Sequence, residues 1–300
     1  MPEPRPTLDQ LHVFLAIVEA GSFAAAARRL GRATSVISYT IANLEAQLGL
    51  ELFDRHGTRK PSLTDAGRAI LADSRTVAMG LGGLVAKVRG LRQGLEAEVT
   101  LVVDVMLPTP HLVSVLDGFR AAFPTVTLRL HVETLGAVAQ LVQTGVANIG
   151  ISGPLFARLD DLIFDPIGAI RLIPVAAPGH PLALLGEDIS VAATRDQIQL
   201  VLTDRSDLTR GQDYQVMALR TWRLADLGAK HALLRAGVGW GSMPEAMVAE
   251  DIAAGRLVRL PLKNWDQVGF HLQIVHRIDT PPGPAARWLV DQFRLAARNF

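Results

Sequence analysis

The sequence predicts a mixed α+β protein with a helical amino-terminal part, one long connecting helix and a two-lobed α/β part. Three observations support this prediction: a helix–break–helix pattern over residues 22–45, an apolar heptad seam over residues 70–91, and alternating strands and helices from residue 99 onward. We expect segments at 7–64, 65–93 and 97–300, with a first lobe at about 97–165 and 270–300 and a second at about 166–269.

Composition limits the class of protein. Three hundred residues suit two or three domains, and a content of 49% hydrophobic and 20% charged residues is typical of a globular chain. Cysteine is absent, which excludes disulfides, thiolate metal sites and cysteine nucleophiles. Residues 1–6 lack the apolar core of a signal peptide, and the uncharged run 134–157 is too polar for a membrane span. We expect a cytoplasmic protein without a metal or a cofactor.

Charge is unevenly distributed along the chain. Residues 1–92 hold 12 lysines or arginines against 8 acidic residues, a net charge of +4. The remainder holds 18 against 21, a net charge of −3. A more basic amino-terminal part is compatible with one end that binds nucleic acid and another that binds a small molecule.

Residues 22–45 predict two short helices separated by a tight break. Ser22 is a suitable N-cap, alanines follow it, and Gly31 fits the left-handed residue that ends a helix. The second helix is expected to begin near Thr34 or Ser35. Its outer face can enter a DNA major groove, although an ordinary helical hairpin in a core gives the same pattern. The inward positions are Ile37, Ile41 and Leu44, and the outward positions are Ser35, Ser38, Tyr39, Ala42 and Asn43.

The flanking segments favour the DNA-binding interpretation. Before the pattern, Thr7 and Gln10 match the capping box of a first helix. After it, an apolar stretch at 50–53 leads into a basic turn at 54–61. We interpret this turn as a wing that contacts phosphates or the minor groove, the alternative being a solvated surface loop. Its cations are Arg55, Arg59 and Lys60.

A helix of about 28 residues is expected after Thr64, which is a suitable N-cap. Apolar residues recur on it at gaps of four and three for three heptads, with Ser74 as one polar position. Such a seam has little local chain to pack against. We therefore expect it to pair with its copy in a second subunit, the alternative being burial in the larger domain. The dimerisation positions are Ile70, Val77, Leu81, Leu84, Val88 and Leu91.

The remaining chain predicts two α/β halves. Crossings near 154–166 and 268–276 indicate two lobes, and ligands in such folds bind at the carboxyl ends of strands and between lobes. Strands are expected at 99–106, 126–132, 147–152, 170–176, 198–202, 257–261 and 272–275, and helices at 108–122, 135–144, 226–236, after Pro244 and at 287–297.

These features together resemble the LysR-type transcriptional regulator family over nearly the whole chain. The strongest match covers residues 14–67, where short motifs stand at the family's spacing, and weaker matches lie at 144–145 and 236–244. The strongest motifs are Gly21-Ser22-Phe23, Leu44-Glu45, Leu48-Gly49, Leu52-Phe53-Asp54-Arg55 and Leu63-Thr64-Asp65-Ala66-Gly67.

The resemblance implies a winged helix-turn-helix, a dimerising linker helix and an effector domain like a periplasmic binding protein. Members form dimers or tetramers that bind promoter DNA and respond to a small molecule in the interlobe cleft. Candidate partners are therefore double-stranded promoter DNA, a small-molecule effector, further copies of the chain and RNA polymerase. The chain departs from the family at Ser35, where proline is common, at Tyr39, where arginine or histidine is common, and at Asn148, where aspartate is common.

The expected DNA contacts lie on the recognition helix, in the break before it, at the start of the preceding helix and on the wing. A helix start such as Ser22 can offer a backbone amide to a phosphate. The set is Ser22, Arg32, Thr34, Ser35, Ser38, Tyr39, Asn43, Arg55, Arg59 and Lys60.

The resemblance places effector contacts at strand ends and around a helix start of the second lobe. If Asp104 and Asp226 both face the cleft, a cationic or hydroxyl-rich effector is expected. Alternatively, Asp104 belongs to a hydrogen-bonded turn and Asp226 caps a helix. The set is Asp104, Met106, Leu107, Pro108, Thr134, Leu135, Ser152, Thr203, Asp204, Trp222, Asp226 and Lys230.

Other classes of protein fit the sequence less well. The glycine-rich segment 237–241 follows a helix rather than a strand, and the chain contains no nucleophile elbow, zinc-protease helix or P-loop, so we do not expect an enzyme. His271 and His276 would point to opposite faces of a strand, against a metal pair. A solute-binding protein would leave the first ninety residues without a role. A DNA-binding architectural protein with a vestigial pocket stays an alternative.

Overall fold

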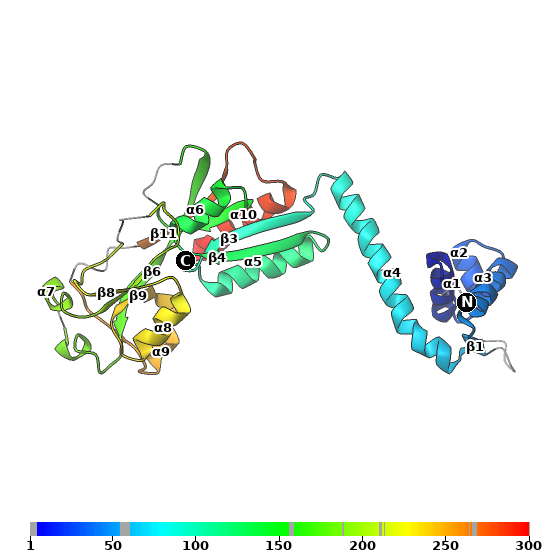
Figure 1. The fold of residues 1–300 in the computed structure, drawn as a ribbon, viewed down its shortest axis with the longest axis horizontal. Coiled ribbons are helices and arrows are strands. Elements are labelled where there is room, and N and C mark those ends of the chain that lie inside the picture. The colour runs from blue at the N-terminus through cyan, green and yellow to red at the C-terminus, as the bar shows by residue number, and fades with distance from the viewer. Residues whose placement is uncertain are drawn as a thin grey trace. The chain divides into compact units, whose positions relative to one another are not determined.

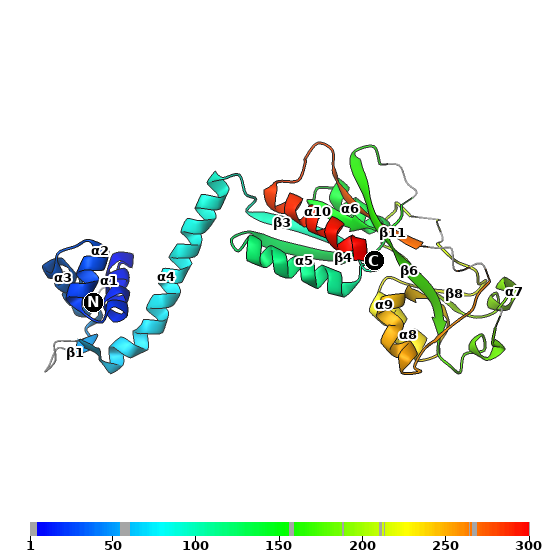
Figure 2. The same ribbon diagram turned by 180° about the vertical axis from the view of Figure 1, so that it is seen from behind.

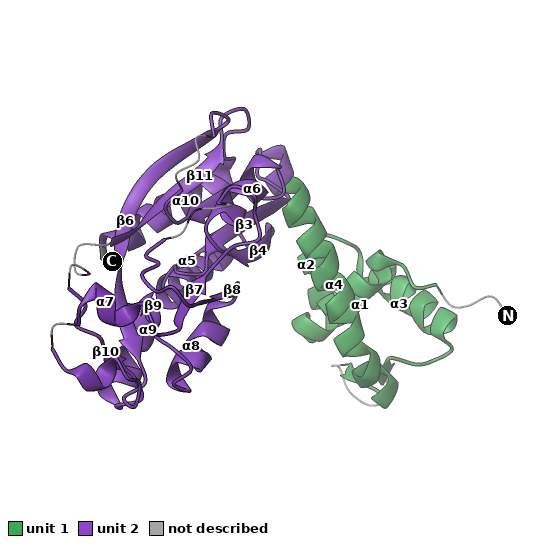
Figure 3. Ribbon diagram, turned by 60° about the vertical axis from the view of Figure 1, so that its left-hand side comes forward, with its two compact units in different colours: residues 1–89 green, residues 90–300 purple. Residues whose placement is uncertain are grey.

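The computed structural model describes residues 5–54, 61–155, 159–187, 189–209, 212, 214–263, 265 and 269–299. The chain divides into two compact units, Met1–Arg89 and Gly90–Phe300 (Figure 3). Helices and strands are both well represented, as the sequence predicts (Figure 1).

Three helices form the core of the first unit: α1 (Leu8–Ala20), α2 (Phe23–Leu30) and α3 (Thr34–Leu48). Each ends at a glycine with positive φ, which satisfies late helix carbonyls without steric cost. The capping box at Thr7 and the Ser22 cap are both present, so these sequence predictions are confirmed. A short antiparallel pair, β1 (Phe53–Asp54) with β2 (Ser62–Leu63), follows.

The inward face of α3 is fully buried in this core, as predicted. Ile37, Ile41 and Leu44 have no exposed surface and lie in one apolar cluster with Phe14 and Ile17 of α1. The apolar period of 3.6 residues places these three side chains on one face, so the opposite face of α3 must point away from the core.

The connecting helix α4 (Asp65–Arg92) has the 28 residues expected from the sequence. The Thr64 Oγ1 accepts a hydrogen bond from the Gly67 backbone N–H at 3.0 Å, as an N-cap does. The first turns contact the helical core: Ile70 packs against it and Ser74 is buried. Ile70, one of the expected dimerisation positions, therefore also has an intramolecular partner.

The later turns of α4 expose a row of apolar side chains. Val77, Leu81, Leu84, Val88 and Leu91 are 40–59% exposed. An 18-residue window of α4 has a mean hydropathy of 1.3 and is 6% buried, so by length and composition alone this helix is apolar enough to cross a membrane. Such a surface requires an apolar covering.

A seven-stranded sheet in the order β10-β6-β11-β5-β3-β4, with β9 beside β6, forms the frame of the second unit. In the first lobe, β3 (Glu98–Asp104) runs parallel to β4 (Thr127–Glu133) and β5 (Ile149–Ser152). Side chains alternate along β3. Val99, Leu101 and Val103 join the cluster containing residues of α5 (Thr109–Ala122) and α10 (Pro284–Ala296), whereas Val102 joins the cluster containing residues of α6 (Gly136–Gln143).

Two strands cross between the lobes. β6 (Leu162–Ala176) pairs antiparallel with β11 (Gly269–Arg277) over nine residue pairs (Figure 2). The register shifts between Leu272 and Gln273, next to the pairing of Gln273 with Pro166. Because Pro166 has no N–H to donate, an irregularity in the ladder is expected there. The sequence predicted a strand only over 170–176 because it treated 154–166 as a connection. The crossing is instead one continuous strand.

The second lobe is built on the far half of β6. It contains the parallel pair β7 (Gln199–Leu202) and β8 (Thr221–Leu224), the strands β9 (Gly241–Pro244) and β10 (Val258–Arg259), and the helices η1 (Ala183–Leu185), α7 (Val191–Thr194), α8 (Leu227–Arg235) and α9 (Glu245–Ala253). The chain ends in η2 (Ala297–Asn299). β8 and β9 were not predicted from the sequence, because neither four-residue segment is as rich in valine, isoleucine and leucine as β5 and β7.

Candidate functional site

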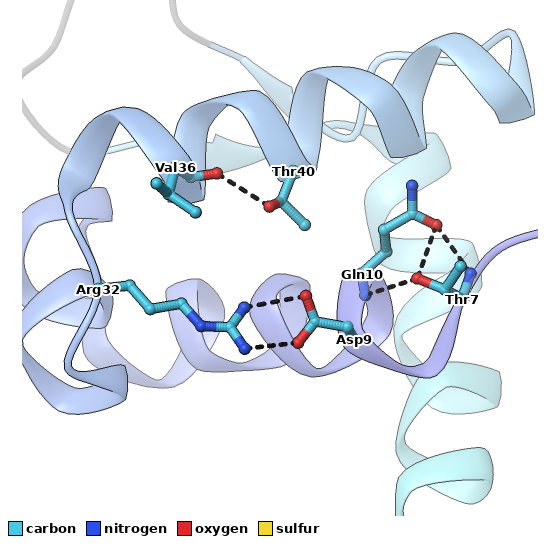
Figure 4. Close-up of polar contacts among 6 residues, drawn as sticks. All are labelled: Thr7, Asp9, Gln10, Arg32, Val36 and Thr40. Atoms are coloured by element: carbon cyan, nitrogen blue, oxygen red, sulfur yellow. Dashed lines mark hydrogen bonds and ion pairs between the residues drawn. The ribbon is translucent and has the colours of Figure 1, made fainter.

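The outer face of α3 is presented to solvent as the sequence predicts. Tyr39 is 69% exposed, Thr34 and Ser35 are exposed, and Ser38 and Asn43 are half-buried. Thr40 donates its hydroxyl to the Val36 carbonyl at 2.9 Å, so its hydrogen-bonding capacity is used within the helix (Figure 4). The exposed face therefore offers hydroxyls, an amide and one phenol, without a carboxylate.

Arg32, in the turn between α2 and α3, forms a bidentate ion pair with Asp9 of α1 (Figure 4). The guanidinium nitrogens lie 2.9 and 2.8 Å from the two carboxylate oxygens. The hydrogen bond and the charge of Arg32 lower the pKa of Asp9, and those of Asp9 raise the pKa of Arg32. The pair remains solvent-exposed, so Asp9 orients Arg32 and reduces its charge towards a phosphate.

Other cations of this unit differ in their surroundings. Arg28, in the last turn of α2, is exposed and has no ion pair within the described residues, a feature that the sequence analysis did not select. Arg29 pairs with Glu19 at 2.7 Å. The expected wing cations Arg55, Arg59 and Lys60 lie outside the described residues, although β1 and β2 on either side of them form the expected hairpin strands.

Replacing Asp9 by asparagine should free the Arg32 charge. We expect Asp9→Asn to tighten binding to any DNA duplex severalfold at low salt and to steepen the slope of log affinity against log salt by about one, because one more phosphate contact releases one more counterion. Fluorescence anisotropy on a random duplex at several salt concentrations measures both quantities.

The matched control for this prediction is Asp65→Asn, which also removes a carboxylate paired with an arginine, Arg68, at an exposed site on α4. Equal effects of the two substitutions would indicate a general charge effect. Weaker DNA binding by Asp9→Asn would show that the ion pair itself is required.

A cavity of about 430 Å³ lies between the lobes of the second unit. This volume falls in the range of about 300 to 1,000 Å³ that is typical of small-ligand sites. Most of its lining is apolar, and it draws on both lobes and on the crossing strands. Representative lining residues are Met106 and Leu135 of the first lobe, Phe270 of β11, and Leu200, Tyr214 and Lys230 of the second lobe.

The backbone around this cavity is strained at two points. Leu135, with φ of 46°, and Gln215, with φ of 55°, are the non-glycine residues with positive φ in the described chain, and both line the cavity. Such conformations cost free energy and persist where the surrounding structure enforces them, often at binding sites. The two positive-φ residues therefore lie at the same cavity.

Lys230 is the notable charged group of the cavity. The side chain lies on α8 and is only 2% exposed. Its stem lies against Gly241 of β9, where a Cβ would stand 3.2 Å from the lysine Cε and 2.7 Å from the Leu200 carbonyl oxygen. Within the described residues no side chain forms a hydrogen bond or an ion pair with its ammonium. Burial alone lowers the pKa of Lys230 to about 8.

Asp104, at the end of β3, is buried and turned towards backbone amides. Its carboxylate accepts hydrogen bonds from the Met106 N–H at 2.9 Å and the Leu135 N–H at 2.8 Å. Burial raises the pKa of Asp104 to about 6, against the lowering effect of its amide donors. Met106 and Leu135 line the cavity, whereas the Asp104 carboxylate is hydrogen-bonded within the turn after β3. This is the arrangement that the alternative interpretation of the sequence expected.

Asp204 forms a polar contact between the lobes. Its Oδ2 accepts hydrogen bonds from the Ala137 N–H at the start of α6 and from the Ser206 hydroxyl, at 3.1 and 2.8 Å. Gly136 permits this approach, because a Cβ there would stand 2.5 Å from the Ser206 Oγ. Thr134 adds a bond from its hydroxyl to the Thr203 carbonyl at 3.1 Å. The carboxylate thereby occupies the helix N-terminus that an anionic ligand would use.

The structure places the remaining expected effector residues away from the cavity. Leu107 and Pro108 line a separate cavity of about 260 Å³ beside the start of α5. Ser152 is buried and donates its hydroxyl to the Gly153 carbonyl. Trp222 is exposed on β8, and Asp226 is exposed and caps α8 by accepting from the Ala229 N–H at 2.6 Å.

Several cavity residues escaped the sequence analysis. Gln199 lines the cavity, but its side-chain amide donates a hydrogen bond to the Gln215 carbonyl and accepts one from the Met217 N–H. Tyr214 and His271 enter the lining from a loop and from β11. A preference for the carboxyl ends of strands could have found none of these, because Gln199 begins β7, His271 lies within β11 and Tyr214 lies in a loop. No group of three or more potential metal ligands gathers in the described residues.

The unpaired ammonium gives a prediction for stability. At neutral pH the folded protein holds Lys230 charged although its pKa is lowered from 10.5 to about 8, a cost of about 3 kcal/mol. We expect Lys230→Met to raise the free energy of unfolding at pH 7 by about this amount. The gain should shrink as pH rises from about 8 to 10.5, because the native lysine then loses its proton in the folded state.

Urea unfolding followed by tryptophan fluorescence measures this effect in the full chain, since all four tryptophans belong to the second unit. Lys263→Met removes an exposed lysine of the same unit and is the control. A stability difference that does not change between pH 7 and 10 would contradict the assignment of the cost to the Lys230 charge.

Comparison with known proteins identifies the class. Residues 8–68 match the family described as bacterial regulatory helix-turn-helix protein, lysR family, and residues 92–298 match the LysR substrate binding domain. The chain belongs to the LysR family of transcriptional regulators. It is a regulator with an effector-binding domain and not an enzyme.

Curated relatives and solved structures agree with this assignment. The chain is 32% identical over 256 residues to the probable HTH-type transcriptional regulator YhaJ of Escherichia coli, covering 84% of each chain. It is 28% identical to the regulator AceR of Acinetobacter baumannii, covering 95% of this chain and 96% of the other. A mutant of OxyR from Corynebacterium glutamicum shares the fold with a TM-score of 0.54 and 23% identity, covering 100% of this chain and 94% of that one.

Proposed function

We propose that this regulator binds promoter DNA sequence-specifically through the outer face of α3, supported by contacts from the wing between β1 and β2. The observation that supports this most directly is the exposed, carboxylate-free face of a helix that packs through its opposite face, ends at Gly49 and is followed by an antiparallel strand pair. A helix of this kind fits the major groove of DNA, and a hairpin beside it can contact the phosphate backbone of the DNA. The protein would act in the cytoplasm, with RNA polymerase as a further partner.

We infer that the chain assembles through α4 into a homodimer, with a tetramer as the higher assembly. The exposed row from Val77 to Leu91 supports this, because apolar side chains of this kind at heptad spacing pair with a second helix. The proposal also gives the apolar surface of α4 a protein covering. The glycines of α4 weaken the isolated helix and make packing against a second helix more important.

A charge placed in this row should dissociate the assembly. We expect Leu84→Glu to weaken self-association at least tenfold, because a carboxylate in an apolar interface loses its hydration. Ala86→Glu adds the same charge at an exposed position two residues further on, away from the row, and should leave association intact. Sedimentation equilibrium distinguishes the two variants, and equal association of Leu84→Glu and the native protein would contradict the α4 interface.

DNA recognition is tested by anisotropy on the duplex upstream of the protein's own gene and on a scrambled duplex of equal length. We expect Arg55→Ala to weaken binding to both duplexes and to flatten the salt slope by about one. Tyr39→Ala should instead change the preference between the two by about fivefold or more, because it removes a side chain that faces base edges. Unchanged binding by both variants would remove α3 and the wing from the interface.

We further propose that the cavity between the lobes binds the effector. Its volume, its apolar lining and the strained residues Leu135 and Gln215 support this role. The contact between Asp204 and the start of α6 joins the lobes beside it. A ligand that alters this contact would have a direct route to the relative position of the lobes.

A further inference from the structure

Lys230 is unusual because a buried ammonium in a folded protein normally has an acceptor. Here the side chain is 2% exposed and lines the interlobe cavity, yet no carboxylate or other side chain within the described residues pairs with it. An unpaired buried charge is costly, and a bound partner of opposite charge removes that cost. The open acceptor position therefore faces the cavity.

The other charged groups of the cleft do not supply that acceptor. No aspartate or glutamate belongs to the described lining of the cavity. Asp104 accepts from the Met106 and Leu135 amides, and Asp204 from the Ala137 amide and two hydroxyls. Asp226 caps α8. Among the described lining residues, Lys230 therefore has no carboxylate as a partner.

We propose that Lys230 is the anion-binding residue of the cavity and that the effector is a small organic carboxylate with a mostly apolar body. The inference rests on the proposed effector role of the cavity. A carboxylate fits better than a phosphate, because a phosphate requires several strong donors and only one ammonium is buried here. Leu135, Leu200 and Phe270 would contact the apolar body. The cationic effector considered from the sequence has no acidic partner among the described residues that line this cavity.

The start of α5 is a poor anion site in this chain. Pro108 stands at the N-cap and Pro110 in the first turn, so two of the residues there have no N–H to donate. The neighbouring amides of Met106 and Leu135 are already bound to Asp104. Lys230, on the opposite lobe, is the charged group left for a ligand.

The test uses the full chain and a panel of carboxylates, each with its neutral amide: benzoate with benzamide, phenylacetate with phenylacetamide, and 4-methylpentanoate with its amide. Isothermal titration at pH 7 and constant ionic strength measures affinity. We expect at least one carboxylate to bind, its amide to bind at least tenfold more weakly, and Lys230→Met to weaken the carboxylate at least tenfold without affecting the amide. Lys263→Met should bind like the native protein.

Three results would overturn the proposal: no binding by any carboxylate at millimolar concentration, equal binding of a carboxylate and its amide, or unchanged carboxylate affinity in Lys230→Met. DNA anisotropy with and without the bound carboxylate separates this inference from the proposed function. Carboxylate binding that depends on Lys230 but leaves DNA binding unchanged would support the anion site and remove the effector role.

Discussion

The antiparallel pairing of β6 with β11 is the interaction on which the second unit depends. These two strands run through both lobes, and the other strands of the sheet attach on either side of them. The first lobe adds β5, β3 and β4, whereas the second adds β9 and β10 along the far half of β6. Because both lobes are fixed to one ladder, the cavity between them is lined by residues of β11 and β6 as well as by each lobe.

The electrostatics of the cleft follow from which charges find backbone partners. The carboxylates lie where chain turns and helix starts offer N–H groups, so Asp104, Asp204 and Asp226 are all satisfied internally. A lysine ammonium needs an acceptor instead, and α8 brings Lys230 to the cavity wall, where no side chain among the described residues accepts a hydrogen bond from it. The lowered pKa of Lys230 and the raised pKa of Asp104 have the same origin, the loss of water around a buried charge.

Local signals in the sequence predicted the first unit well. Caps at Thr7 and Ser22, glycines at helix ends and the apolar period of α3 depend on neighbours within a few residues, and all appear in the structure. The same periodicity does not distinguish the partners of the early turns of α4, because Ile70 satisfies the seam pattern and also packs against the helical core. In the second unit the short strands β8 and β9 and the full length of β6 were missed, since their pairing partners are distant in sequence.

By itself, the sequence determined the helices of the first unit, the family, the outward face of α3 and the apolar row of α4, because caps and periods are properties of contiguous residues. Only the tertiary structure decided which polar side chains are left without partners. Asp104, Asp226 and Lys230 look equivalent in the sequence as candidate ligands of the cleft. Their roles diverge once folding supplies amides to the two aspartates and places the lysine on a cavity wall, because hydrogen-bond partners and burial depend on chain segments far apart in sequence.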